Sequence, residues 1–206
     1  MEVARQLFFQ QGYNATGIAQ ILKTSNAYSG SLYHFFQTKE DLLAAVLEKY
    51  KAMLKTDVLQ PAFARASDPI ERLFAVLDGY RRLLQATDFH LGCPIGNLAL
   101  EVSNSYPLVR RLITENFEDW CQAIENLISA ASGRLPLDTN AKELSRYVLA
   151  TMEGAVMLAR AHRSFEPFDA AINSLRNHFD RLLQDGSQWS SPRQESKSDS
   201  TQEESI

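Results

Sequence analysis

Cys93 is the residue whose type and setting point most directly to chemistry. Pro94 follows it, and a proline at the first position of a helix makes Cys93 the expected N-cap. Unpaired backbone amides and the helix dipole at that position favour a thiolate, which is the reactive form of cysteine. His90 could accept the thiol proton, and Arg160 could stabilise the thiolate as a nearby cation. The alternative interpretation is a small buried thiol that fills a gap in the core, and both remain open.

A thiol enzyme that uses Cys93 with His90 as its base is one possible function. Such an enzyme needs a third group that orients the base and a site for the oxyanion, and the sequence contains no pattern for either. The G-x-S-x-G, H-E-x-x-H and phosphate-loop motifs are also missing. Cys121 lies in the apolar stripe of an expected helix and is interpreted as core. We therefore expect no catalytic residues, no cofactor and no metal site.

The overall composition is that of an ordinary globular protein. Of the 206 residues, 45% are hydrophobic and 22% are charged, and the net charge is −4. Positive charge gathers at the N-terminal end, where residues 1–39 contain Arg5, Lys23 and Lys39 against Glu2 alone. No apolar run is long enough to span a membrane, the N-terminus lacks a signal pattern, and two cysteines without a pairing motif fit a reducing compartment. We expect a cytoplasmic protein with no membrane partner.

Helical spacing of apolar residues predicts an all-α fold of about nine helices that position these groups. Thr38 and Asp41 form a capping box, and Asp68 followed by Pro69 marks another helix start. From Gly186 the composition turns to Ser, Gln, Glu and Lys, which predicts a disordered tail over 186–206. The expected helices cover 2–11, 16–23, 28–36, a helix from 38, a helix from 69, and 94–105, 107–131, 138–162 and 167–184.

The stretch 16–40 predicts a helix-turn-helix, because two short helices flank a tight turn around Ser25 and Asn26. In this motif the second helix enters the major groove of DNA and presents side chains to base edges. The segments 30–36 (GSLYHFF) and 38–40 (TKE) resemble the signature of the TetR family of transcriptional regulators. Asn26 stands where that family usually has a glycine, and asparagine tolerates the left-handed conformation of such a turn.

The resemblance implies roles in DNA binding for several residues of this motif. Contacts to the phosphate backbone set the register of the protein on DNA, and contacts to the bases select the sequence. The residues placed at the phosphate backbone are Thr16, Tyr33, His34 and Lys39, and those placed near the bases are Tyr28, Ser29 and Ser31. Gly30 belongs to the same DNA-binding set. The alternative is that the aromatic pair at 33–34 only flanks two core aromatics, Phe35 and Phe36.

The segments 92–103 (GCPIGNLALEVS) and 163–167 (RSFEP) resemble a branch of TetR-type repressors that respond to drugs, flavonoids or reactive electrophiles, in some members through a cysteine at this place. The resemblance implies a repressor that leaves its operator when a small apolar or electrophilic inducer binds. It also implies a DNA-binding domain at 1–37 and a ligand-binding and dimerisation domain at 38–185. A helical adaptor that keeps a degenerate helix-turn-helix and binds no DNA is the alternative.

The C-terminal helices supply candidates for an inducer pocket and a dimer interface. Aromatic residues at helical spacing more often form core than a binding site, so both interpretations apply to the pocket candidates. Two long amphipathic helices could pair with their symmetry mates and set two recognition helices against a palindromic operator in double-stranded DNA. The pocket candidates beside Cys93 are Tyr80, Phe89, Phe117, Trp120, Met152 and Arg160, and the homodimer candidates are Leu144, Val148, Ala155, Leu158, Ile172, Leu175 and Phe179.

Overall fold

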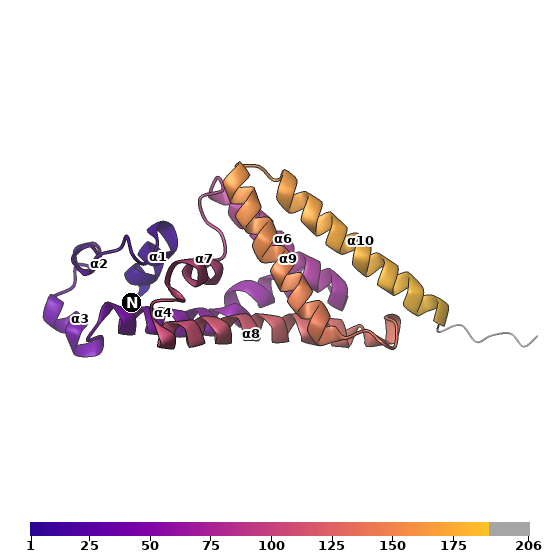
Figure 1. The fold of residues 1–206 in the computed structure, drawn as a ribbon, viewed down its shortest axis with the longest axis horizontal. Helices are drawn as coiled ribbons and strands as arrows, with labels where there is room; N and C mark the ends of the chain where they lie inside the picture. The colour runs from indigo at the N-terminus through magenta and orange to yellow at the C-terminus, as the bar shows by residue number, and fades with distance from the viewer. Residues whose placement is uncertain (190–206) are drawn as a thin grey trace, which may run out of the picture.

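The computed structural model describes residues 1–189, which fold into helices joined by short turns (Figure 1). Three helices form the head: α1 (Glu2–Gln11), α2 (Ile18–Ser25) and α3 (Ser29–Phe35). A fourth, α4 (Lys39–Met53), leads from the head into the body, which consists of the π-type turn η1 (Leu54–Leu59), α5 (Gln60–Phe63), α6 (Pro69–Ala86), α7 (Pro94–Val102), α8 (Pro107–Ala130), the 3-10 turn η2 (Ser132–Arg134), α9 (Ala141–His162) and α10 (Glu166–Trp189). Every expected helix is present and residues 1–189 contain no strand, so the all-α prediction is confirmed.

Local capping sets the helix starts that the sequence marks. The amide of Asp41 donates to the Thr38 hydroxyl at 3.0 Å, and the amide of Thr38 donates to the Asp41 carboxylate at 2.9 Å, which completes the capping box of α4. The Asp68 carboxylate accepts two backbone N–H groups at the start of α6. Asn26 ends α2 in the left-handed conformation, with φ 50° and ψ 37°.

The head lies at one end of an elongated molecule, and α10 runs beside α9 away from it (Figure 1). In the body, α4 and α8 run side by side, and α8 also packs against α9. Buried side chains of α4, α6, α8 and α9 form much of the core. No helix within residues 1–189 is long and apolar enough to cross a membrane.

Two segments differ from the sequence prediction. The end of α4 passes directly into the π-type turn and α5, where no boundary was expected. At the other end of the chain, α10 continues to Trp189, into the segment expected to be disordered. In this added segment, Gly186 is buried against the Arg134 carbonyl, and a Cβ at position 186 would have no room there, so glycine allows α10 to pack closely on η2. Residues 190–206 of the predicted tail lie outside the described part of the chain.

The apolar faces of α9 and α10 are used largely inside the chain itself. Val148, Ala155, Leu175 and Phe179 are at most 2% exposed, and Phe179 packs edge-on against Phe74 of α6 with 5.7 Å between ring centres. These four side chains have no surface to offer a second chain, which corrects their assignment to a dimer interface. The other three candidates keep exposed area: Leu158, which is 46% exposed, and the half-buried Leu144 and Ile172.

Candidate nucleic-acid interface and internal cavity

The side chains around the start of α3 face solvent. Tyr28, directly before the helix, is 87% exposed, and Tyr33 one turn later is 50% exposed. A Cβ at position 30 would meet no heavy atom within 4 Å, so this side of α3 is open. The other exposed members of the predicted set are Ser29, Ser31 and His34. Hydroxyl, phenol and imidazole groups presented in this way can bind phosphate oxygens and base edges.

Phe35 is not a core residue. Its side chain is 72% exposed, and its ring meets the His34 ring edge-on with 5.0 Å between centres. Phe36 alone of this pair packs, half-buried, against the core. The alternative in which Tyr33 and His34 only flank two core aromatics therefore fails for Phe35.

Thr16 and Lys39 both form hydrogen bonds within the head. Thr16 is fully buried, and its hydroxyl donates to the Gly12 carbonyl at 2.6 Å. The Lys39 ammonium donates to the Tyr13 carbonyl at 2.5 Å and lies 4.0 Å from the centre of the Tyr13 ring. Burial lowers the pKa of Lys39. Thr16 has no exposed surface to offer a phosphate, which corrects its expected position at the phosphate backbone. Lys39 is half-buried and is held here by the Tyr13 carbonyl.

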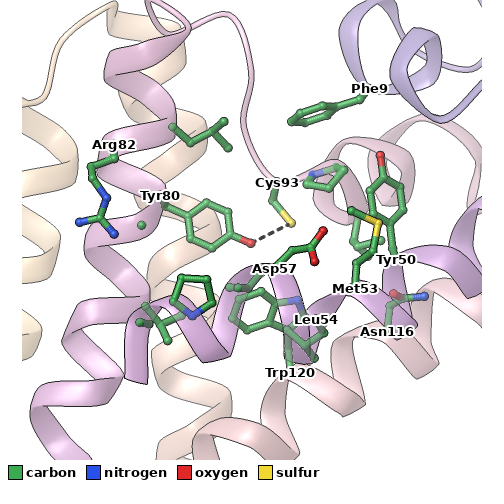
Figure 2. A pocket seen from close by; sticks show the side chains of 18 of the residues that line it. Phe9, Tyr50, Met53, Leu54, Asp57, Tyr80, Arg82, Cys93, Asn116 and Trp120 are labelled. Carbon is green, nitrogen blue, oxygen red and sulfur yellow. Dashed lines mark hydrogen bonds between the residues drawn. The ribbon is translucent and has the colours of Figure 1, made fainter. Parts of the chain in front are cut away.

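A cavity of about 490 Å³ lies where the head meets the body (Figure 2). Its wall combines Phe9 of α1 and Tyr50 of α4 with Tyr80 of α6 and Trp120 of α8. The Tyr80 and Trp120 rings lie 5.9 Å apart. The π-type turn adds Asp57, which lies among these side chains in Figure 2. A mostly apolar, aromatic wall with a few polar groups is typical of a small-molecule site.

Two polar groups of this wall have hydrogen-bonding capacity that the other described residues do not use. The Tyr50 hydroxyl is buried without a hydrogen-bond partner among the described residues, and burial raises the pKa of Tyr50 to about 12. Asn116 donates through its amide nitrogen to the carbonyls of Leu47 at 3.2 Å and Leu112 at 2.8 Å. These bonds hold the side chain of Asn116 and leave its amide oxygen as the acceptor.

Cys93 is the N-cap of α7, as the sequence predicts, but it is only 3% exposed. Its sulfur accepts the Gly96 amide at 3.4 Å and the Tyr80 hydroxyl at 3.8 Å. Burial raises the pKa of the Cys93 thiol, and the nearby Glu153 carboxylate raises it further. The predicted lowering of this pKa is wrong, because the loss of hydration outweighs the stabilisation that the helix N-terminus gives a thiolate.

His90 and Arg160 hold the loop before α7 and do not activate the thiol. The exposed His90 ring contacts the Thr87 carbonyl through Nδ1 at 2.9 Å and lies 3.3 Å from the Arg163 guanidinium. Arg160 donates to the side-chain oxygen of Asn97 at 2.7 Å and to the backbone carbonyl of His90 at 3.1 Å. The thiol enzyme therefore loses its proposed base.

A second cavity of about 260 Å³ is lined by residues of α7, α8 and α9. Phe117 and Arg160 line it together with Cys93, which contributes to both cavities. One carboxylate oxygen of Glu153 is buried here without a partner among the described residues, and burial raises the pKa of Glu153. Gly96 makes room for this carboxylate, because a Cβ at position 96 would overlap a Glu153 oxygen.

The predicted pocket residues therefore divide between different places. Tyr80, Trp120 and Cys93 line the larger cavity. Phe117 and Arg160 line the smaller one. Phe89 packs instead against Phe165, with 4.7 Å between ring centres. Met152 is 1% exposed and belongs to the core.

Comparison with known proteins identifies the two parts of the chain. Residues 1–46 match the model of bacterial regulatory proteins of the tetR family, and residues 69–174 match the C-terminal domain of LmrA/YxaF-like transcriptional regulators. This chain belongs to the TetR family. It is a DNA-binding transcriptional regulator, and the head is the helix-turn-helix domain of that family.

Individual relatives of this TetR-family regulator match over most of their length. A helix-turn-helix transcriptional regulator of Mycobacterium tuberculosis is 31% identical over 180 residues, which is 84% of this chain and 89% of that protein. The transcriptional repressor DhaR of a Mycobacterium species is 25% identical over 185 residues, 89% and 90% of the two chains. The crystal structure of a TetR regulatory protein from Rhodobacter sphaeroides has a TM-score of 0.77 and 25% identity, covering 86% of this chain and 95% of that one.

Three residues that line the cavities of this TetR-family regulator were not predicted from the sequence. Tyr50 and Asp57 line the larger cavity, but the π-type turn that places Asp57 there has no local sequence signal. Glu153 does have a local sequence signal, because it lies between Leu149 and Val156 in the apolar stripe of α9. An acid at such a position is rarely buried unless it has a partner or a function.

Proposed function

We propose that this regulator is a homodimeric repressor that binds a palindromic operator and leaves it when a small molecule occupies the larger cavity. The observation that carries the proposal is the composition of the cavity wall, in which Arg5 and Phe9 of the head stand beside Tyr80 and Trp120 of the body. An occupant therefore contacts both parts at once. A ligand shifts an equilibrium only if it binds two arrangements differently, and an occupant at such a junction distinguishes arrangements of the head.

The proposed regulator acts in the cytoplasm. In its complex with DNA, α3 enters the major groove. Tyr28, Ser29 and Ser31 face the bases, and Tyr33 and His34 face the phosphates. Their exposure supports this assignment, as does the match of residues 1–46 to the family. Repression is proposed from the similarity to DhaR, whose name describes it as a repressor.

The proposed dimer pairs the outer faces of α9 and α10 with those of a second copy. Tyr147 is 48% exposed and Leu158 is 46% exposed on α9, with the half-buried Leu144 one turn before Tyr147. Large exposed apolar side chains that share a helix face are typical of an interaction surface. A twofold pairing of these two helices forms a four-helix interface and sets two heads against one palindrome.

The proposed inducer is a small, mostly apolar aromatic molecule that binds without a covalent bond. The rings of Tyr50, Tyr80 and Trp120 offer stacking surfaces, and the Tyr50 hydroxyl and the Asn116 oxygen can each form a hydrogen bond with it. The buried thiol of Cys93, with its raised pKa, favours a non-covalent ligand over an electrophile.

The DNA-binding part is tested by selecting sites from a random duplex pool with the purified full chain. The selected duplex is expected to be palindromic, and its affinity is expected to fall steeply as the salt concentration rises, because phosphate contacts release counterions. Binding that does not depend on the DNA sequence would refute an operator-specific regulator.

The inducer part is tested through the two tryptophans of the chain. In a Trp189→Phe variant, the fluorescence reports on Trp120 in the cavity wall alone. Planar aromatic compounds that quench this signal should release the selected DNA over the same concentration range. Gly79→Leu places a side chain at the cavity and should abolish both effects, whereas Ala86→Leu, at an exposed position of the same helix, should abolish neither. Quenching without release would show that the cavity is not the inducer site.

A further inference from the structure

A second connection between the head and the body lies at the far end of α7. The side chain of Glu101 is half-buried, and its carboxylate accepts the amide N–H of Tyr13 at 2.9 Å and that of Asn14 at 2.6 Å. Hydrogen bonds to an ionised acceptor are stronger than neutral ones. Because two oxygens of one planar group bind two consecutive amides, they fix both the position and the orientation of the α1–α2 turn.

Gly12 allows the carboxylate to come this close. Its φ is +90°, and a Cβ at this position would lie 3.0 Å from an oxygen of Glu101. Glycine adopts such a positive φ without steric cost. On the other side of the turn, Lys39 at the start of α4 donates to the Tyr13 carbonyl. The α1–α2 turn is therefore held by α7 and by α4 at once.

The helix that carries Glu101 is anchored in the body. It begins at the cavity wall, where Cys93, Pro94 and Ile95 line the larger cavity, and it packs against α8. Glu101 lies in its last turn, next to the head. The orientation of the head is therefore set by the body through α7 as well as by the chain connection through α4. In a dimer, that orientation determines how far apart the two recognition helices lie.

We propose that Glu101 is a specificity-determining residue that fixes the head on the body and so sets the half-site spacing that the dimer accepts. The inference rests on the proposed function, since spacing has a meaning only for a dimer on a palindrome. Moving one half-site by one base pair shifts it by about 3.4 Å and turns it by about 35° around the helix axis. Heads held by Glu101 cannot follow this movement. Heads released at the α1–α2 turn follow it by pivoting at the link between α3 and α4.

The test compares three duplexes: the selected palindrome, and the same palindrome with one base pair added or removed at its centre. The wild-type chain should bind both altered duplexes more weakly by about tenfold or more, which corresponds to about 1.4 kcal/mol. Glu101→Gln keeps the size of the side chain but places an amide donor against one of the two N–H groups. In this variant, the ratio of the affinity for the selected palindrome to that for an altered duplex should fall to about threefold or less. Glu101→Asp, which keeps the charge, should recover part of the discrimination.

A matched control separates positioning from charge. Glu48 on α4 is exposed, so Glu48→Gln removes the same charge without touching the turn, and it should keep the wild-type ratio. Hydrogen–deuterium exchange supplies a measurement that needs no DNA. The amides of Tyr13 and Asn14 should exchange faster in Glu101→Gln and at the wild-type rate in Glu48→Gln.

The possible outcomes distinguish the two proposals. If Glu101→Gln weakens binding to all three duplexes by one common factor, the residue only stabilises the fold, and the inference is overturned. Unchanged exchange at the two amides also overturns it. If the wild-type chain selects no DNA sequence, the proposed function fails, and exchange at the amides still decides whether Glu101 holds the turn.

Discussion

The hydroxyl of Tyr80 donates a hydrogen bond to the sulfur of Cys93 across 3.8 Å, and both side chains are buried (Figure 2). A neutral phenol is a weak replacement for the hydration that a thiolate would lose on burial. This hydrogen bond by itself lowers the pKa of Cys93, but burial and the Glu153 carboxylate raise it more, so the sulfur stays protonated in a wall that both cavities share. Cys93 contributes to the shape of the site and to the capping of α7.

Cys93 should react slowly with electrophiles while the protein is folded. Burial and the Glu153 carboxylate raise the pKa of the thiol, so little thiolate exists near neutral pH, and access to the sulfur is restricted. Alkylation by iodoacetamide at about pH 7.5 should be at least about tenfold slower in the folded chain than in urea, as followed by peptide mass spectrometry. Equal rates in the two conditions would restore the thiolate sensor.

Replacing Glu153 by glutamine should stabilise the protein at neutral pH but hardly at acid pH. Because burial raises the pKa of this carboxyl, the folded state binds its proton more tightly than the unfolded state, and stability falls as the pH rises from the ordinary pKa through the raised one. Glutamine has a similar size and no charge. The melting temperature of Glu153→Gln should therefore exceed that of the wild type at about pH 7.5, by roughly 2–4 °C for each kcal/mol gained. Thermal melts between acid and neutral pH measure this, and a gain that is largest in acid would contradict it.

Lys39→Met should leave the salt dependence of DNA binding unchanged and lower the melting temperature. A residue that neutralises one phosphate contributes about 0.9 to the slope of log affinity against log salt concentration. Lys39 instead donates to the Tyr13 carbonyl inside the head. Anisotropy titrations of the selected duplex at several salt concentrations give the slope for both proteins. A slope smaller by about one in Lys39→Met would place Lys39 back at the phosphate backbone.

Aspartate should have different effects at Leu158 of α9 and at Leu175 of α10, because only Leu175 is fully buried. Leu158→Asp puts a charge on the exposed face of α9 and should give a folded monomer that binds the palindrome weakly. Leu175→Asp buries a charge in the core of the chain itself and should cost about 3 kcal/mol or more, so that the protein unfolds. Sedimentation equilibrium and circular dichroism report the two results. If Leu158→Asp remains a dimer, the interface lies elsewhere.

Features that depend on neighbours in the sequence were predicted well. The caps at Thr38, Asp68 and Cys93 are local patterns, and the structure contains all three. Asn26 in the left-handed conformation and the helix-turn-helix itself were predicted for the same reason. A cap involves residues within one turn of each other, so no knowledge of the tertiary fold is needed.

Features that depend on distant parts of the chain were not predicted. Lys39 can donate to a phosphate or to the Tyr13 carbonyl, and its sequence context does not distinguish these acceptors. The apolar face that holds Leu175 packs inside the chain or against a second chain with the same periodicity. The N-cap of α7 lowers the pKa of Cys93 locally, but the larger and opposite effect of burial comes from residues brought together by the fold.

The contact between Gly12 and Glu101 restricts how this protein can evolve. An alanine at position 12 meets a Glu101 oxygen at 3.0 Å and must also adopt the positive φ of the glycine. A shorter side chain at 101 relieves the first problem but gives up both hydrogen bonds to the α1–α2 turn. Two codons in separate parts of the gene are therefore coupled. Related sequences that have lost the glycine at 12 should also have replaced the glutamate at 101, and their operators should tolerate a wider range of half-site spacings.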